Sequence, residues 1–542
     1  MRTSPREYGL PHGSWRTHQH EAVQELLTLE PGETVVMEAP TGSGKTGVVT
    51  ALAVEWPVMA LSHTKMLQQA NYAGTYGYVH LFGKGNYNCP MNGGRASMCS
   101  YDDVRKCPQY SACPYYIRKR EIINSRLAAL NYAYFLAASQ WSRSVASGRV
   151  LVMDECDLLP ELILEHSSVT VDVADRGKWG LPPFERITTR GSAAFGFPGI
   201  SQPEDAAADW LERSILRMKV QVNKLKHQFA RHNRDKDLHK QKTDAEALYY
   251  RLAAVRESID ESPKDWFIRS GPGARELPGG RTANGFVCKP LTARHHAASR
   301  LLHGERNVLM SATIGDFGLF CEELGINGHR EIRVPNQWAP EVRPVYYFDG
   351  GPRIGRSADE KGYDEQARLI AQAINSVPRS WSGVILCTSK QAAFQLRNLL
   401  AEHHGMYDRV WTPNKRTGTN QQMNDWVAEK KRRPNAIAIT WSWWSGVDLL
   451  DERILICAKI PYGFIGSDYT RAKMQYSGKV YQANTARRLI QGCGRTRRGR
   501  PGDYDINGKQ NGLVVIADEN WHRIRSYLSP DFLEAMVPWP GG

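Results

Sequence analysis

Short, continuous apolar runs recur along the chain, and glycine-containing turns or helical patterns follow several of them. Runs of this length are typical of strands buried on both faces of a parallel sheet. They form two groups, the first at residues 34–37, 58–61, 150–153 and 307–310, the second at residues 383–387, 436–439, 454–457 and 513–516. Helical patterns cover residues 21–27 and 391–401. The pattern predicts two α/β units, the second starting near residue 343.

A helical pattern occupies residues 204–261, between the two groups of strands. Apolar residues recur there at alternating steps of four and three, in two series separated by the polar run 231–240: Leu211, Ile215, Met218, Val222, Leu225 and Phe229, then Ala245, Leu248, Leu252, Val255 and Ile259. This spacing predicts two amphipathic helices packed as an antiparallel hairpin. Residues 266–290 are rich in Gly and Pro, and we expect them to return the chain to the first unit.

The segment between the first strand and the next helix has the pattern of a phosphate-binding loop. It reads Ala-Pro-Thr-Gly-Ser-Gly-Lys-Thr over residues 39–46. Glycines allow backbone N–H groups to surround an anion, and the helix that follows adds its positive dipole end. Lys45 is expected to reach the β- and γ-phosphates of ATP, and the Thr46 hydroxyl to bind Mg²⁺. The other nucleotide-binding positions of this loop are Thr41, Gly42, Ser43 and Gly44.

Two adjacent carboxylates, Asp154 and Glu155, end the apolar run at residues 150–153. In an ATPase, Asp154 would hold Mg²⁺ and Glu155 would orient and deprotonate the attacking water.

Four of the ten cysteines crowd into one short segment: Cys89, Cys99, Cys107 and Cys113. In a large chain of this kind, such a group indicates a metal site rather than disulfides. Four thiolates can hold a [4Fe–4S] cluster or a zinc ion. Zinc sites favour paired Cys-x-x-Cys spacing, which this segment lacks, so the cluster is the preferred interpretation.

The residues directly after Cys113 combine aromatic and cationic side chains. Tyr115, Arg118, Lys119 and Arg120 could stack on bases and hold the phosphates of a single strand. The formal net charge of the chain, +14, also suits a polyanionic partner. A solvated basic helix face is the alternative interpretation of these residues.

Several motifs resemble those of superfamily 2 helicases, and more specifically the DinG/XPD family of iron–sulfur helicases. Arg16 and Gln19 resemble the adenine-reading motif, and residues 62–69, including Thr64, resemble a segment that contacts the nucleic-acid backbone in that family. The Lys-Gly-x-x-Asn-Tyr-x-Cys pattern ending at Cys89 and the Cys-x-Tyr-Tyr pattern starting at Cys113 resemble the limits of the family's cluster domain.

The second half of the chain continues the resemblance. Ser-Ala-Thr at residues 311–313 is similar to the motif that couples ATP to nucleic acid. Residues 443–448 resemble the motif that would supply Gly446 and Asp448, and residues 491–498 resemble the sixth helicase motif, which would supply Gln491 and the arginine fingers Arg495 and Arg498. We expect both arginines to lie on one face of a helix.

Three positions depart from the family pattern. Cys156 and Asp157 replace the usual Ala and His, and Ser445 replaces the usual Glu. The first two leave open how hydrolysis is coupled to nucleic acid.

The resemblance implies an α/β fold with two RecA-like motor domains, at residues 1–80, 126–170 and 291–335 and at residues 336–542. A cluster domain at 81–125 and a helical arch domain at 171–290 would be inserted in the first. The expected activity is ATP- and Mg²⁺-dependent 5′–3′ unwinding of DNA by a monomeric motor that moves on single strands and at junctions. The alternatives are a translocase that does not unwind and a zinc-containing nucleic-acid binding module.

A cytoplasmic location without membrane contact is also expected. No apolar run approaches the roughly 18–20 residues that a bilayer crossing needs, and the first residues lack the apolar core of a secretory signal.

Overall fold

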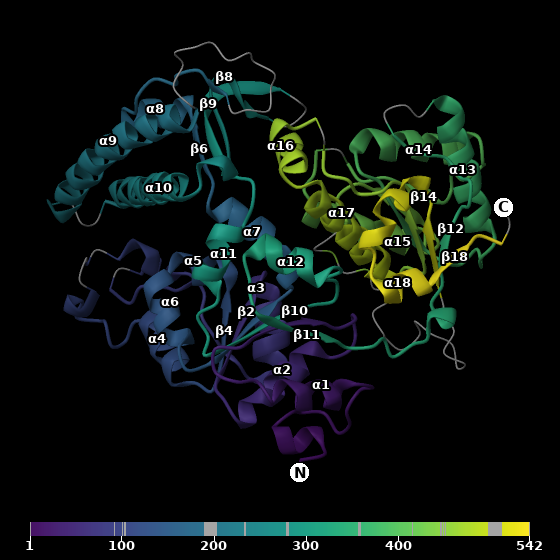
Figure 1. The fold of residues 1–542 in the computed structure, drawn as a ribbon, viewed down its shortest axis with the longest axis horizontal. Helices are drawn as coiled ribbons and strands as arrows, with labels where there is room; N and C mark the ends of the chain where they lie inside the picture. Colours follow the sequence, from purple (N-terminus) through teal and green to yellow (C-terminus); the bar gives the residue numbers. More distant parts are fainter. Residues whose placement is uncertain are drawn as a thin grey trace.

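The fold is seen in a computed structural model of the chain (Figure 1). It describes residues 2–91, 93–99, 101, 104–188, 203–231, 235–277, 281–355, 359–414, 416–444, 447, 449, 451–464, 466–496 and 512–540. Two parallel sheets lie side by side, with a helical lobe above the first of them (Figure 1).

The first sheet has seven parallel strands in the order β11-β1-β10-β5-β2-β4-β3. Their bounds are Thr34–Glu38 (β1), Val58–Ser62 (β2), Val79–His80 (β3), Leu127–Asn131 (β4), Val150–Asp154 (β5), Arg306–Ser311 (β10) and His329–Arg333 (β11). Both faces are covered. Val36 belongs to one hydrophobic core and its neighbours Val35 and Met37 to another, because successive side chains of a strand point to opposite faces.

The second sheet also has seven parallel strands, in the order β14-β15-β13-β16-β17-β12-β18. Their bounds are Val345–Tyr347 (β12), Gly383–Leu386 (β13), Val410–Trp411 (β14), Ile437–Thr440 (β15), Ile454–Cys457 (β16), Leu513–Ile516 (β17) and Met536–Pro538 (β18). The helices of this unit are α13 (Glu360–Asn375), α14 (Lys390–Glu402), α15 (Thr419–Arg432), α16 (Asp468–Tyr476), α17 (Gly478–Cys493) and α18 (Pro530–Glu534). The prediction of two α/β units with parallel sheets is confirmed.

The cysteine-rich segment lies between β3 and β4 and has little regular structure. It contains short 3₁₀ turns, and the helix α4 (Pro114–Asn124) then leads the chain back to the sheet. Cys113 is the residue before the first turn of α4, and Pro114 occupies that turn, where its missing N–H costs nothing. Helices α5 (Tyr132–Ala137) and α6 (Ser139–Ala146) follow β4.

The helical lobe contains the expected hairpin, made of α9 (Pro203–Arg231) and α10 (Lys236–Glu261). The hairpin packs on a four-stranded antiparallel sheet in the order β6-β9-β8-β7. These strands span Val169–Asp172 (β6), Ile187–Thr188 (β7), Trp266–Glu276 (β8) and Thr282–Pro290 (β9). Residues 266–290 lead the chain back to α11 and β10 of the first unit, as expected, but they do so as two paired strands that the sequence did not predict. Gly271 and Gly273 lie in β8, where the register shifts between Gly271 and Arg275, and Gly285 lies in β9 opposite Gly271.

Helix α16 of the second unit docks on the hairpin β8–β9 of this lobe (Figure 1). Asp468 forms an ion pair with Arg269, and its N–H donates to Glu276 over 2.6 Å. The Tyr469 hydroxyl donates to the Pro290 carbonyl over 2.7 Å. The helical lobe is therefore attached both to the first unit, through the chain, and to the second unit, through α16.

Most of the remaining helices belong to the first unit. They are α1 (Gln19–Leu26), α2 (Lys45–Ala51), α3 (Lys65–Leu67), α7 (Leu159–His166), α11 (Arg294–Leu301) and α12 (Phe317–Leu324). Helix α8 (Val173–Trp179) instead packs in the helical lobe, where Trp179 belongs to its hydrophobic core. Among the described helices, none has both the length and the apolar character that crossing a membrane requires.

Candidate nucleotide site and interdomain contact

The loop between β1 and α2 has the backbone of a phosphate cradle. Gly42 and Gly44 adopt left-handed conformations, with φ of 87° and 80°. A Cβ at Gly44 would lie 2.6 Å from Nε2 of Gln19, so no other residue fits there without a shift. The Ser43 hydroxyl is buried and has no hydrogen-bond partner in the described part of the chain. An unpaired buried donor in such a loop fits a phosphate ligand. Thr46 lies in the first turn of the following helix, directly after the loop, which suits a Mg²⁺ ligand.

Lys45 lies inside this cradle rather than extended away from it. Its Nζ donates to the Ala39 carbonyl over 2.9 Å and to the Pro40 carbonyl over 3.4 Å. Burial lowers the pKa of Lys45, and the carboxylates of Asp154 and Glu155 oppose that shift. The lysine is therefore close to the acidic pair, as one shared nucleotide site requires.

Arg16 and Gln19 contact the phosphate loop directly. Nε2 of Gln19 donates to the Gly44 carbonyl over 3.1 Å, and Oε1 accepts from the Arg16 N–H over 3.0 Å. The Arg16 guanidinium donates to the Gly42 carbonyl. In this conformation each polar atom of the Gln19 amide makes one bond within the protein, which leaves one N–H and one lone pair for the expected contact with adenine.

Asp154, at the end of β5, is held by two buried tyrosines. Its Oδ2 accepts from the Tyr72 hydroxyl over 2.8 Å, and its backbone carbonyl accepts from the Tyr132 hydroxyl over 2.6 Å. Burial raises the pKa of Asp154, while the charge on Lys45 and the bond from Tyr72 lower it. The carboxylate is thus fixed in position before any ligand arrives.

Glu155 has a backbone conformation that non-glycine residues rarely adopt, with φ of 54°. Such a conformation persists where the surrounding structure enforces it, and it often marks a functional residue. Burial, together with Asp154 and Asp157, raises the pKa of Glu155 to about 7. Lys45 and Arg495 oppose the shift, which places both cations near this carboxylate.

Asp157 connects the two units. It accepts hydrogen bonds from the Ser311 hydroxyl, at the end of β10, and from the Gln491 side chain, on α17. The first bond joins the Ser-Ala-Thr segment to the acidic motif. Burial raises the pKa of Asp157, and the Ser311 bond and the Arg487 charge oppose that rise. The residue that departs from the family pattern therefore makes a contact between the units.

Arg495 lies in a 3₁₀ turn, Gly494–Thr496, because α17 ends at Cys493. The expectation that Arg495 and Arg498 share one face of a helix stays a prediction, because Arg498 lies outside the described residues. Nη1 of Arg495 donates to the Val447 carbonyl over 2.5 Å, and its Nη2 donates to the Trp444 carbonyl over 3.1 Å. Three further expected site residues, Arg498, Gly446 and Asp448, lie outside the described residues.

The four clustered cysteines form no disulfide. Burial raises the pKa of Tyr116, and the thiols of Cys99, Cys113 and Cys107 contribute, so these three thiols flank one phenol ring. Cys89 is buried in a tight turn, where its N–H donates to the Gly94 carbonyl over 2.6 Å. No group of three or more His, Cys, Asp or Glu side chains in the described residues has the arrangement of a metal site. The donor set suits an iron–sulfur cluster, but its arrangement in this conformation is not that of a closed ligand set.

The residues expected to contact nucleic acid differ in exposure. Tyr115 is only 5% exposed, and its hydroxyl shares a 2.6 Å hydrogen bond with Tyr134, so its ring cannot stack on a base in this conformation. Thr64 is exposed, and its hydroxyl accepts from the Leu67 N–H at the start of α3.

The three cations on α4 each already have a protein partner. Arg118 forms an exposed 2.8 Å ion pair with Glu121, and the Lys119 ammonium lies 4.3 Å from the Trp141 ring centre. Arg120 donates to the Ser111 carbonyl over 3.0 Å.

Two tyrosines and an aspartate of this site were not predicted as site residues. Tyr72 lies in an irregular helical segment with no motif around it, and only the fold brings its hydroxyl to Asp154. Tyr132 is the last residue of Leu130-Asn131-Tyr132, which resembles an Asn-Tyr/His segment of the DinG/XPD family, so the sequence held a usable signal. Asp157 was noted only as a departure from the family, and its two partners are distant in sequence.

Comparisons with known proteins agree with this arrangement. Residues 370–534 match the family described as Helicase C-terminal domain, and residues 93–175 match the family DEAD_2. A solved structure named XPD Helicase is similar, with 13% sequence identity, a TM-score of 0.57, and coverage of 97% of this chain and 100% of that chain. An XPD structure named as the apo form has 12% identity, a TM-score of 0.54 and the same coverage.

These identities establish a shared fold, and the two family matches add helicase domains. A comparison with curated protein sequences gave no significant match. The two family matches indicate a nucleic-acid helicase that hydrolyses ATP, and the solved structures show that the chain shares the fold of the XPD helicases.

Proposed function

We propose that the chain is an ATP-dependent DNA helicase that moves 5′ to 3′ on single-stranded DNA. The observation that carries the proposal is the joining of the two units at the nucleotide site: Gln491 of the second unit donates to Asp157, two residues after Glu155 of the first. Nucleotide binding at this place would change the contact between the units, as a motor requires.

The proposed roles follow the geometry of the site. Backbone N–H groups at residues 41–44 and the ammonium of Lys45 hold the phosphates, while Thr46 and Asp154 bind Mg²⁺. Glu155 orients and deprotonates the attacking water. Arg495 is close enough to influence Glu155 and acts as an arginine finger, with Arg498 as its partner. Arg16, Gln19, Gly446 and Asp448 complete the nucleotide site.

Cys89, Cys99, Cys107 and Cys113 are the proposed ligands of a [4Fe–4S] cluster. Such a cluster would tie together a segment that has few regular elements of its own. A zinc ion on the same thiols is the alternative.

The proposed path of the single strand passes the exposed face of α4 and Thr64. Arg118, Lys119 and Arg120 would exchange their present protein partners for phosphates. We keep the expected division into two motor domains, a cluster domain and an arch domain, and a monomeric protein in the cytoplasm.

The test compares two DNA duplexes, one with a 5′ single-stranded tail and one with a 3′ tail, in ATP and Mg²⁺. Unwinding of the 5′-tailed duplex alone is expected, with Lys45→Ala as the inactive control. Unwinding of only the 3′-tailed duplex would overturn the polarity. ATP hydrolysis stimulated by single strands without unwinding would favour the translocase, and nucleic-acid binding without hydrolysis would favour a binding module. Matching RNA duplexes decide between DNA and RNA.

A further inference from the structure

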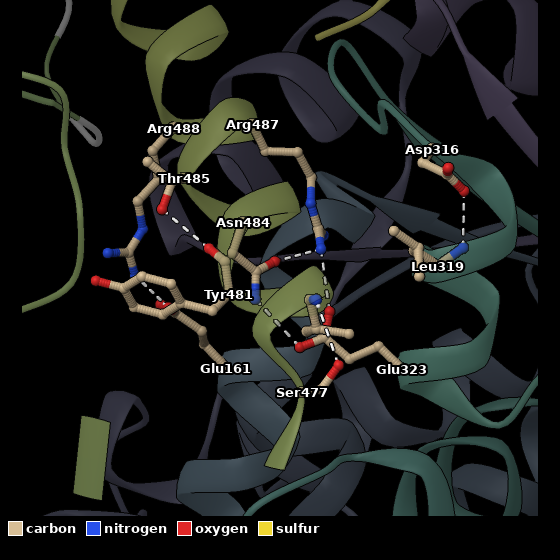
Figure 2. A network of polar contacts seen from close by, with 11 residues as sticks. Glu161, Asp316, Leu319, Glu323, Ser477, Tyr481, Asn484, Thr485, Arg487 and Arg488 are labelled. Atoms are coloured by element: carbon tan, nitrogen blue, oxygen red, sulfur yellow. Dashed lines mark hydrogen bonds and ion pairs between the residues drawn. The ribbon is translucent and has the colours of Figure 1, made fainter. Parts of the chain in front are cut away.

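A second contact between the units lies one helical turn from Gln491, and it is an ion pair. Nη2 of Arg487, on α17, lies 3.0 Å from Oε2 of Glu323, on α12. The side chains are 6% and 3% exposed. Asn484 completes the contact: its Nδ2 donates to Oε1 of Glu323 over 3.3 Å, and its Oδ1 accepts from Arg487 (Figure 2).

Both helices adjoin or carry residues of the nucleotide site. Helix α12 begins shortly after Ser311, and the Asp316 side chain caps it by accepting from the Leu319 N–H over 2.9 Å (Figure 2). Helix α17 is capped by Ser477, carries Gln491 and ends just before Arg495. When a capped helix moves, the residues at its ends move with it, because its end turns do not fray.

The spacing on α17 links the ion pair to the site. Arg487 and Gln491 are four residues apart, so they lie on one face of the helix. Arg487 meets Glu323, and Gln491 meets Asp157, which also holds Ser311. A shift of α17 along its axis or about it would break both contacts together.

The energetics argue against stability as the main role of this pair. A buried ion pair seldom stabilises a protein more than apolar residues of the same size would, because both charges lose their hydration. The pair instead fixes the orientation of the two helices, because only one orientation lets the Glu323 carboxylate, the Asn484 amide and the Arg487 guanidinium bond to one another.

We infer that Glu323 and Arg487 are positioning residues that set the register of α17 on the first unit, and so place Gln491 and Arg495 for ATP hydrolysis. The inference rests on the proposed ATPase function. Neither side chain touches the nucleotide in this mechanism. Their removal should therefore lower the turnover of bound ATP and leave its binding nearly unchanged.

The main test is Glu323→Gln, which keeps the shape and removes the charge. We expect kcat for ATP to fall by roughly 10- to 100-fold, the scale of a small misplacement of reacting groups, with little change in KM. The matched control is Glu322→Gln, the next residue on the same helix. Glu322 pairs over 2.6 Å with Arg294 of its own unit, and both side chains are exposed. This control should keep wild-type turnover.

A double variant separates positioning from a purely structural role. Glu323→Leu alone leaves the buried charge of Arg487 without a carboxylate partner and should lower the melting temperature. Adding Arg487→Met removes that charge and should restore the melting temperature without restoring kcat.

Wild-type kcat in Glu323→Gln, or recovery of kcat with stability in the double variant, would overturn the inference. Absence of ATP hydrolysis in the wild-type chain would instead overturn the proposed function.

Discussion

At the scale of single residues, the phosphate loop shows how side chains can be held in place without a ligand. Lys45 bonds the carbonyls of Ala39 and Pro40, and Gln19 bonds that of Gly44. Each bond satisfies a buried polar group, so the loop is ordered in advance and ATP would have to replace the partners of Lys45.

Lys45→Ala is predicted to reduce ATP hydrolysis to background. Lys45 neutralises charge on the transferred phosphoryl group in the proposed mechanism, and alanine cannot. Its ammonium fills no apolar core, so the melting temperature should stay near that of the wild type. The measurement is steady-state phosphate release with single-stranded DNA, alongside thermal unfolding. Wild-type turnover in the folded variant would remove Lys45 from the site.

Glu38 makes folding stability depend on pH. Burial raises its pKa to about 7, and the charge on Arg333, 3.6 Å away, only partly opposes the shift. An unfolded carboxyl ionises near 4.5. Between these values the folded state holds a proton that the unfolded state has lost, so the contribution of Glu38 to the free energy of unfolding falls as pH rises through this window.

Glu38→Gln should remove that dependence. Relative to the wild type, the variant is expected to gain up to about 3 kcal/mol in free energy of unfolding between pH 4.5 and 7.5. Urea unfolding at several pH values measures the difference. A constant difference between the two proteins across this range would contradict the raised pKa.

At the scale of elements, the position of a helix in the fold decides which of its side chains are buried and which are exposed. The pattern after Cys113 predicted an aromatic and basic helix, and α4 is that helix. Its amphipathic turn places Tyr115 in the core beside Tyr134 and leaves Arg118 exposed. Phosphates could reach the cations of α4 only by replacing their protein partners, such as Glu121 at Arg118, whereas the ring of Tyr115 is closed off by burial.

Cys107→Ser tests the proposed cluster. The wild-type protein, purified without air, should be brown and contain about four irons per chain, as expected for a [4Fe–4S] cluster on four thiolates. The variant should lose colour and iron, and lose unwinding more than basal ATP hydrolysis, because the nucleotide site lies elsewhere. Cys288→Ser is a matched control, since Cys288 is buried in β9 of the antiparallel sheet, far from this segment in sequence. Stoichiometric zinc in a colourless wild-type protein would replace the cluster with zinc.

At the scale of the whole molecule, the helical lobe is attached to both α/β units. Asp468 and Tyr469 at the start of α16 join the second unit to the hairpin β8–β9. We therefore expect the helical lobe to move when the second unit moves. Part of the free energy of ATP hydrolysis would then drive motion of the lobe through α16.

Arg269→Ala combined with Tyr469→Phe is predicted to weaken this connection. Unwinding should fall by roughly fivefold, which corresponds to a coupling of about 1 kcal/mol, while ATP hydrolysis on short single strands stays close to wild type. Arg275→Ala is the control, because Arg275 is on the same hairpin but pairs with Asp172 of β6, within the helical lobe. Equal losses in both activities would show that the contact supports the motor itself and not the connection to the arch.

The sequence by itself determined the two α/β units, the helical hairpin, the phosphate loop and the acidic pair. Each depends on local chemistry: apolar runs that must be buried, glycines that permit left-handed turns, and adjacent carboxylates at a strand end. The hairpin β8–β9 was missed because its glycines resemble those of a loop, and only the pairing with β6 and β7 makes it a sheet.

The tertiary structure alone decided how the units meet. Arg487 and Glu323 are 164 residues apart, and Gln491 and Asp157 are 334 apart, so no local pattern relates either pair. The tertiary structure likewise decided three other features: the burial of Tyr115, the hydrogen bond from Tyr72 to Asp154, and the contacts of Gln19 with the phosphate loop. A side chain's partner depends on which distant surface it is packed against, and that surface exists only after the chain has folded.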